Sequence, residues 1–267
     1  RRYLATQPGS DEAVGGPESM ANRKSWLGRV FLVLLLVVAA GGGYASWKWM
    51  ARVTLTEIQI KGLVHAQESE IMNLIKVDTG AVMFDINALI LEDRIRRHPW
   101  IMQASVARLP TGMLDIQVIE RHPVAQVLAS SGRIEYFVDR NGFRMPLTKE
   151  SFYPVPILSG LRDPYHPVIP IKDEVLKDIL FVLPRLSSQS DALLSEVRRT
   201  SKGIEILTAP VGEGGSIPVV LGKRDFEYRF RLLESFWEQE VLLHQNVTYA
   251  SVDLRFNSQV VTREVMQ

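Results

Sequence analysis

The sequence predicts an α+β protein with a single transmembrane helix, a small domain of the order β-α-α-β-β, and a mixed, mainly antiparallel β domain with a late amphipathic helix. Three observations support this fold class. Residues 30–47 carry no charged side chain, several later stretches alternate apolar and polar residues as strands do, and others repeat apolar residues at helical spacing. A chain of 267 residues is long enough for two small domains beside such a helix.

Composition argues against several classes of function. The formal net charge is +1, which provides no basic field for nucleic acid. The chain has no cysteine, which excludes disulfides, cysteine-bound zinc and a cysteine nucleophile. Its five histidines fall in no metal-ligand spacing, and the glycine-rich residues 212–216 lack the lysine of a phosphate loop. We therefore expect no catalytic, cofactor-binding or metal site, and no enzyme activity.

Residues 26–50 are predicted to form the transmembrane helix, after a disordered cytoplasmic tail at residues 1–25. Because a helix rises about 1.5 Å per residue, roughly 20 apolar residues cross the ~30 Å hydrocarbon core of a bilayer. Tryptophans stand at both ends of the run, and a slight excess of basic residues before it favours a cytoplasmic N-terminus. The alternative is a cleaved signal peptide beginning at Met20, but the length of the apolar run favours a retained anchor.

The first predicted domain covers residues 51–122. Alternating apolar residues predict strands at 53–62, 101–109 and 112–121, with a tight turn between the last two. Helical spacing predicts two short helices between the first two strands, the second of them ending before Pro99. The side chains expected to face the core from the last two strands are Ile101, Ala104, Val106, Leu109, Leu114, Ile116 and Val118.

The second predicted domain covers residues 123–262, and a short tail follows at 263–267. Turn signals such as Asn141-Gly142 predict consecutive hairpin strands at its start. Residues 153–170 are expected to be ordered but irregular, and residues 191–199 to form a short helix. Strands are expected at 203–210 and 217–222. They precede an amphipathic helix whose apolar stripe consists of Phe226, Phe230, Leu233, Trp237 and Val241.

Two blocks of the sequence resemble the FtsQ/DivIB family of bacterial cell-division proteins. In that family a single anchor precedes a POTRA domain and a β domain. A proline and a tryptophan end the second POTRA helix, an Ala-x-Val-x-Arg strand follows, and a Glu-Arg-x-Pro-Val-Ala step closes the domain. The matching residues are Pro99, Trp100, Ala104, Val106, Arg108, Glu120, Arg121, Pro123, Val124 and Ala125, and, in a final strand, Val252, Asp253, Leu254, Arg255 and Phe256.

The resemblance implies a non-enzymatic scaffold that links early and late division proteins and controls septal peptidoglycan synthesis. FtsB/DivIC-like and FtsL-like single-span proteins would bind at the C-terminal sheet edge, and other divisome components at the POTRA domain. An open edge strand offers unpaired backbone groups to a partner strand. The residues that the resemblance assigns to this site are Arg199, Val252, Leu254, Arg255, Phe256, Asn257, Ser258 and Gln259.

The implied location is the inner membrane, crossed once, with both domains in the periplasm and the protein concentrated at the division septum. Two alternatives stay open. The terminal strand could complete the sheet without binding any partner. A POTRA domain could also belong to a chaperone or receptor for protein export or outer-membrane assembly, although this chain has one copy and no barrel-length run of strands.

Overall fold

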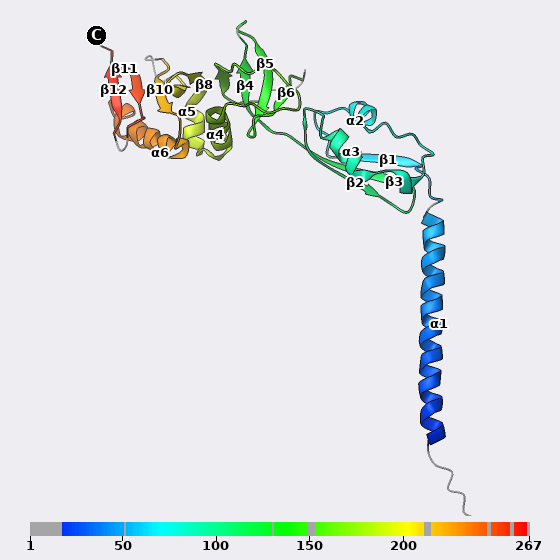
Figure 1. The fold of residues 1–267 in the computed structure, drawn as a ribbon. Helices are drawn as coiled ribbons and strands as arrows, with labels where there is room; N and C mark the ends of the chain where they lie inside the picture. Colours follow the sequence, from blue (N-terminus) through cyan, green and yellow to red (C-terminus); the bar gives the residue numbers. More distant parts are fainter. Residues whose placement is uncertain are drawn as a thin grey trace, which may run out of the picture.

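The structure, a computed structural model, describes residues 18–50, 52–129, 131–148, 153–210, 215–244, 247–256 and 259–265. Its first element is the helix α1 (Glu18–Met50), which stands apart from the two domains (Figure 1). The segment Gly28–Trp49 of this helix is long and apolar enough to cross a membrane. Residues 18–25, predicted as part of a disordered tail, instead form the first turns of α1, because no proline or glycine interrupts the helix there.

The first domain packs two short helices on one face of a three-stranded sheet. Its strands are β1 (Glu57–Lys61), β2 (Ile101–Arg108) and β3 (Met113–Glu120), in the order β1-β3-β2. β1 runs parallel to β3, and β2 runs antiparallel to it. Between β1 and β2 the chain forms α2 (Glu68–Ile75), a 3-10 turn η1 (Met83–Asp85) and α3 (Ala88–Ile95). The predicted β-α-α-β-β order is therefore confirmed.

Residue spacing explains the core of this domain. The buried residues of each helix lie four positions apart, so they share the face that meets the sheet. Leu109, predicted to face inward, is 37% exposed because it lies past the end of β2, in the hairpin, where strand alternation no longer applies. The buried apolar residues on α2, α3 and β3 are Ile71, Ile75, Leu91, Ile95, Leu114, Ile116 and Val118.

The second domain is built on one mixed sheet, which among the described residues has the order β12-β11-β10-β9-β8-β7-β4-β5-β6. The pairs β4–β7, β7–β8 and β10–β11 are parallel, and the other five are antiparallel. The strands are β4 (Pro123–Leu128), β5 (Ile134–Asp139), β6 (Arg144–Pro146), β7 (Ile157–Ser159), β8 (Leu194–Thr200), β9 (Gly203–Thr208), β10 (Pro218–Gly222), β11 (Tyr249–Asp253) and β12 (Val261–Glu264).

Two predictions for the middle of the second domain are wrong. Residues 153–170, expected to be irregular, include β7, which joins β4 to β8 and makes the sheet continuous. Residues 191–199, expected to be helical, change structure within the segment, since the helix α5 (Ser188–Leu193) ends where β8 begins. In both cases pairing with distant strands decides the structure, and such pairing leaves little trace in a short local pattern.

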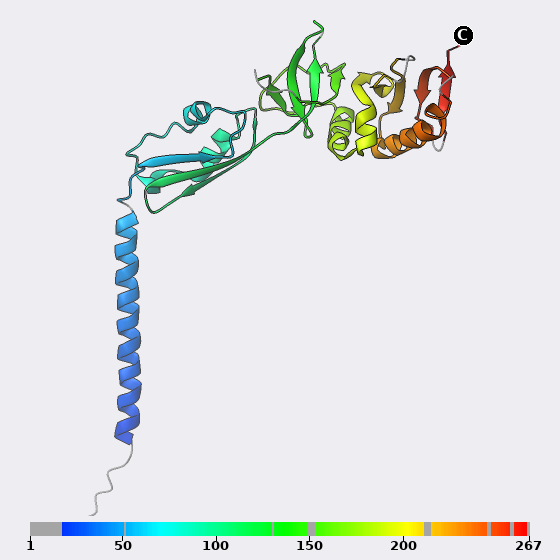
Figure 2. The same ribbon diagram turned by 180° about the vertical axis from the view of Figure 1, so that it is seen from behind.

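The helices α4 (Glu174–Val182) and α6 (Phe226–Phe236) lie on the same side of this sheet in both ribbon views (Figures 1 and 2). A 3-10 turn, η2 (Leu183–Arg185), follows α4, and a π-helical turn, η4 (Trp237–Val241), extends α6. Every residue of the predicted apolar stripe, from Phe226 to Val241, is buried in the core of this domain. The helix and its inward face were therefore predicted correctly.

Glu120, at the end of β3, closes the first domain. Its carboxylate accepts the backbone N–H groups of Val64, His65 and Ala66, at donor–acceptor distances between 2.9 and 3.0 Å. It also lies 2.7 Å from Nδ1 of His65. This carboxylate therefore fixes the loop between β1 and α2.

The core of the first domain continues into the second. The His65 ring stacks on the buried Trp100, with ring centroids 4.4 Å apart. Phe137 of β5 and Met145 of β6 are buried in the same apolar cluster as Trp100. Tyr153, which follows β6, places its hydroxyl 2.6 Å from Nε2 of His65. Side chains from both domains thus form one packed junction.

Candidate partner-binding edge

The C-terminal edge of the large sheet is β12. The expectation that residues 252–256 form the final strand is wrong, because β11 ends at Asp253 and is paired on both sides, with β10 and with β12. All four residues of β12 are exposed, and no described strand pairs with its outer side. The edge that could accept a partner strand therefore consists of Val261–Glu264.

Val252 and Leu254, predicted as contact residues, are fully buried. Val252 lies in register with Val219 on one side and Thr262 on the other. The backbone N–H of Leu254 donates to the carbonyl of Val220, 2.9 Å away. Both side chains are part of the core, so they support the edge and cannot touch a partner at its surface.

Arg255 follows β11 and is partly exposed. Its guanidinium binds the Asp253 carboxylate twice, with Nε–Oδ1 at 2.9 Å and Nη2–Oδ2 at 2.6 Å. Burial alone would raise the pKa of Asp253, but the hydrogen bonds from Arg255 outweigh it and hold that pKa below its ordinary value. An acidic group on a partner could pair with Arg255 only in competition with Asp253.

Phe256 presents an apolar side chain beside this ion pair and is 47% exposed. Its carbonyl accepts from Nη1 of Arg229, a buried residue of α6, at 2.8 Å, and Arg229 also donates to the carbonyl of Leu254. Helix α6 therefore fixes the backbone that carries Phe256. Of the remaining predicted residues, Gln259 is exposed, and Asn257 and Ser258 lie outside the described residues.

Arg199 lies apart from the other predicted site residues. It belongs to β8, three places from β11 in the sheet, or roughly 14 Å at ~4.8 Å per strand. Its Nε donates to Oδ2 of Asp173 at 2.8 Å, while Oδ1 of Asp173 caps α4 by accepting from Leu176. Burial favours a raised pKa for Asp173, but these hydrogen bonds prevail and lower it. The contact between Arg199 and Asp173 therefore connects β8 to the N-terminus of α4.

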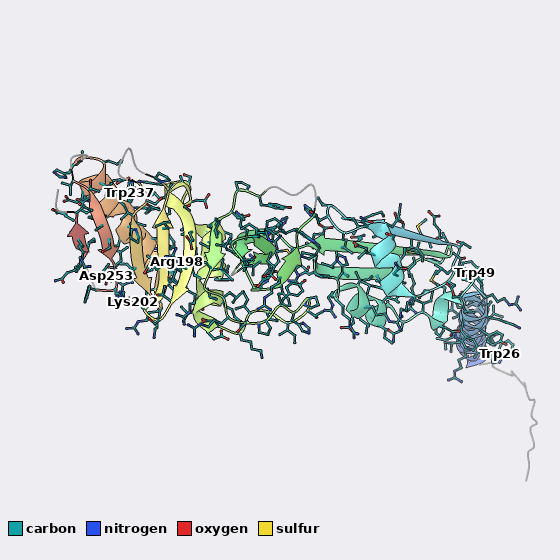
Figure 3. All side chains as sticks on the ribbon, turned by 90° about the horizontal axis from the view of Figure 1, so that it is seen from above. Trp26, Trp49, Arg198, Lys202, Trp237 and Asp253 are labelled. Carbon is teal, nitrogen blue, oxygen red and sulfur yellow. The ribbon has the colours of Figure 1, made fainter. Side chains whose placement is uncertain are left out.

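A groove of about 600 Å³ brings Arg255 and Phe256 together with cations that the sequence did not single out. Lys202 comes from the turn between β8 and β9, and Lys223 and Arg224 from the segment before α6. Figure 3 shows Lys202 and Asp253 at the same end of the sheet. The turn that carries Lys202 and the segment that carries Lys223 and Arg224 come together only through the order of the strands. No local sequence pattern could therefore have predicted a basic groove here.

A second groove, of about 780 Å³, lies between α4 and the start of α6. It is lined by cations such as Arg140, Lys177 and Arg231 and by acidic residues such as Asp178 and Glu227. These charges do not form an arrangement of nucleophile, base and orienting group. Across the part of the chain that the structure describes, no group of three histidine, aspartate or glutamate residues could hold a metal ion.

Comparison with known proteins adds an independent finding. Residues 122–263 match the family described as FtsQ/DivIB, C-terminal related, and residues 53–121 match the FtsQ-type POTRA domain. The chain is 40% identical to "Cell division protein FtsQ" of Rhodothermus marinus, over 91% of this chain and 90% of the relative. It is 31% identical to the protein of that name from Salinibacter ruber, over 86% and 90%. The corresponding values for Geotalea daltonii are 27%, over 86% and 84%.

Proposed function

Because the chain belongs to the FtsQ/DivIB family of cell-division proteins, we propose that it is a non-enzymatic divisome scaffold that binds FtsB/DivIC-like and FtsL-like partners at β12. The POTRA domain receives other division components, and the two sites together link early to late proteins and control septal peptidoglycan synthesis. The observation that carries this proposal is the exposed outer side of β12, next to the basic groove.

Strand addition suits this edge physically. A partner strand gains backbone hydrogen bonds along β12, and the side chains beside it set specificity. Phe256 offers an apolar contact at the mouth of the groove, and the lysines and arginines around it favour an acidic partner segment. We therefore expect the partner strand to carry apolar residues and at least one acidic residue.

The apolar segment Gly28–Trp49 of α1 supports a location in the membrane. The protein is a single-pass membrane protein, and we propose that it crosses the inner membrane with its N-terminus in the cytoplasm and both domains in the periplasm, concentrated at the division septum. Three basic residues, Arg23, Lys24 and Arg29, precede most of the apolar segment, while Lys48 and Arg52 follow its end. This small excess supports a cytoplasmic N-terminus.

Binding of an FtsB-like periplasmic segment to the full chain in lipid nanodiscs tests the proposal. Thr262→Pro removes one backbone donor from the centre of β12, and we expect it to abolish measurable binding. Phe256→Ala should weaken binding about tenfold, which corresponds to ~1.4 kcal/mol. Isothermal titration calorimetry gives both values, and circular dichroism verifies folding.

Phe181→Ala is the matched control, because Phe181 is a phenylalanine of similar exposure, 43%, on α4. Its affinity for the segment should equal that of the wild type. Wild-type affinity in both Thr262→Pro and Phe256→Ala would rule out β12 as the docking edge.

A further inference from the structure

The end of the POTRA domain nearest α1 carries a cluster of exposed apolar side chains, here named the proximal patch: Phe84, Leu89, Ile90 and Leu109. They are between 37% and 73% exposed. They come from η1, from the first turn of α3 and from the hairpin that follows β2. A single exposed apolar residue needs no explanation, but four residues from three segments at one end of a domain indicate a surface that is covered in use.

Backbone contacts connect η1 and its preceding residue to Val53 and Thr54, which follow the end of α1. The Met83 N–H donates to the carbonyl of Val53 at 2.9 Å, and Thr54 and Val82 form a β-bridge. Val53 lies three residues after Met50, the last residue of α1, so at ~3.5 Å per residue the two are at most about 11 Å apart. The η1 turn therefore stays near the end of the span at any tilt of the domain.

The hairpin is tied to the same place. The Gly112 carbonyl accepts from the N–H of Thr56 at 2.8 Å. Nη1 of Arg108 donates to the carbonyls of Phe84 and Ile86, at 3.3 and 3.0 Å. The three segments thus form one surface beside the end of α1, and Figure 1 shows the domain directly beyond that helix.

We propose that the proximal patch docks on the membrane surface from which α1 emerges, with its apolar side chains in the interfacial layer. The POTRA domain then sits at a fixed height above the bilayer, and the junction at Trp100 passes this constraint to the β domain. The proposal rests on α1 spanning the membrane, but not on strand addition at β12.

Because α1 already holds the POTRA domain at the membrane, a shallow contact is sufficient for the proximal patch to dock. Once α1 is inserted, docking is intramolecular, so a few partly buried side chains can hold the domain against the lipid. The charges around the patch have both signs, so docking depends on apolar burial and little on anionic lipid. The basic residues are Arg52, Lys76, Arg94 and Arg108, and the acidic residues are Glu57, Asp78 and Asp85.

The absence of cysteine makes a spin-label experiment direct, because each introduced cysteine is the only one. A nitroxide at Asp85→Cys, next to Phe84, is compared in the full chain in phosphatidylcholine nanodiscs. Its accessibility to oxygen relative to a water-soluble nickel chelate reports depth. We expect a value several-fold above that of a label at Val64→Cys, an exposed site at the opposite end of the domain beside Glu120.

Two further variants complete the test. Adding Phe84→Ser and Leu89→Ser to the Asp85→Cys chain should return the label to an aqueous value, and anionic lipid should change the wild-type value little. A label at Ala39→Cys, near the middle of the apolar segment of α1, must show burial in lipid. An aqueous label at 85 with a buried label at 39 would overturn the docking alone, leaving the patch to a protein partner. An aqueous label at 39 would overturn the span and the docking together.

Discussion

At the residue scale, the step Glu120-Arg121-His122-Pro123 has a structural explanation. Glu120 binds three consecutive backbone N–H groups and lies against His65. Arg121 donates to the buried Asp139 at 2.8 Å, across the boundary between the domains. The sequence identified these residues by resemblance, but it could not show what they bind, because their partners lie far away in the chain.

Replacing Glu120 with Gln should destabilise the protein by about 1–3 kcal/mol at pH 7, since an amide is a weaker acceptor for these N–H groups. Burial opposes ionisation of Glu120, but the backbone hydrogen bonds outweigh it and lower its pKa. The ionised carboxylate therefore stabilises the fold above the unfolded pKa of about 4.3, and this contribution is lost as the pH falls through the folded pKa.

The measurement for Glu120 is urea unfolding between pH 7 and pH 3. The difference between wild type and Glu120→Gln should shrink as the pH falls below about 4.3. Glu57→Gln, on the exposed face of β1, serves as control and should cost little at any pH. A Glu120→Gln difference that is the same across this range would contradict a role for the ionised carboxylate.

At the element scale, elements with a long local pattern of apolar residues were predicted correctly, and an element with a very short pattern was missed. The late helix was predicted with its buried face, because Phe226, Phe230 and Leu233 repeat over several turns. The three-residue strand β7 was missed, although its Leu158 is fully buried and it joins the two halves of the sheet. Three residues are too few to show alternation, and only pairing with β4 and β8 defines them.

Gly160, directly after β7, gives a test of this pairing. Its φ is +79°, and a Cβ there would lie 2.3 Å from the carbonyl oxygen of Arg199 on β8. Gly160→Ala therefore adds a backbone clash to the strain of a left-handed conformation, and we expect a loss of more than about 2 kcal/mol in the free energy of unfolding.

Gly132→Ala is the matched control for Gly160→Ala. Gly132 has a similar φ of +77°, but nothing lies within 4 Å of a Cβ built there. It should lose only about 1–2 kcal/mol, the strain alone. Equal losses in the two variants, measured by thermal unfolding, would show that β7 does not approach β8 as closely as described.

At the scale of the whole molecule, the domain order could be predicted, but the position of the candidate docking edge could be predicted only in part. The resemblance placed most of the docking residues at 252–259, whereas the edge strand of the described sheet, β12, lies a few residues later. Whether a strand is an edge depends on what pairs with it, and this cannot be seen in its own residues. For the same reason Arg199 was grouped with Arg255, although two strands separate β8 from β11.

The shared junction should couple the stability of the two domains. Phe137 belongs to β5 of the second domain but is buried beside Trp100, with ring centroids 6.3 Å apart. Phe137→Ala should cost about 3–5 kcal/mol and increase amide hydrogen exchange in β3 as well as in β5. Exchange that increases only in the second domain would show that the junction does not couple them.

The central claim is that a partner adds a strand to β12, and cysteine cross-linking tests it most directly. Val261→Cys, exposed on β12, is the only cysteine in the full chain, and single cysteines are placed at consecutive positions along the FtsB-like periplasmic segment. Because a disulfide needs Cα atoms within about 7 Å of each other, we predict the strongest cross-link at the one partner position directly opposite residue 261, weaker cross-links two positions to either side, and none at the adjacent positions, whose side chains lie on the other face. Secondary cross-links three or four positions from the strongest one, as for a helix, or no cross-links at all, would contradict strand addition at this edge.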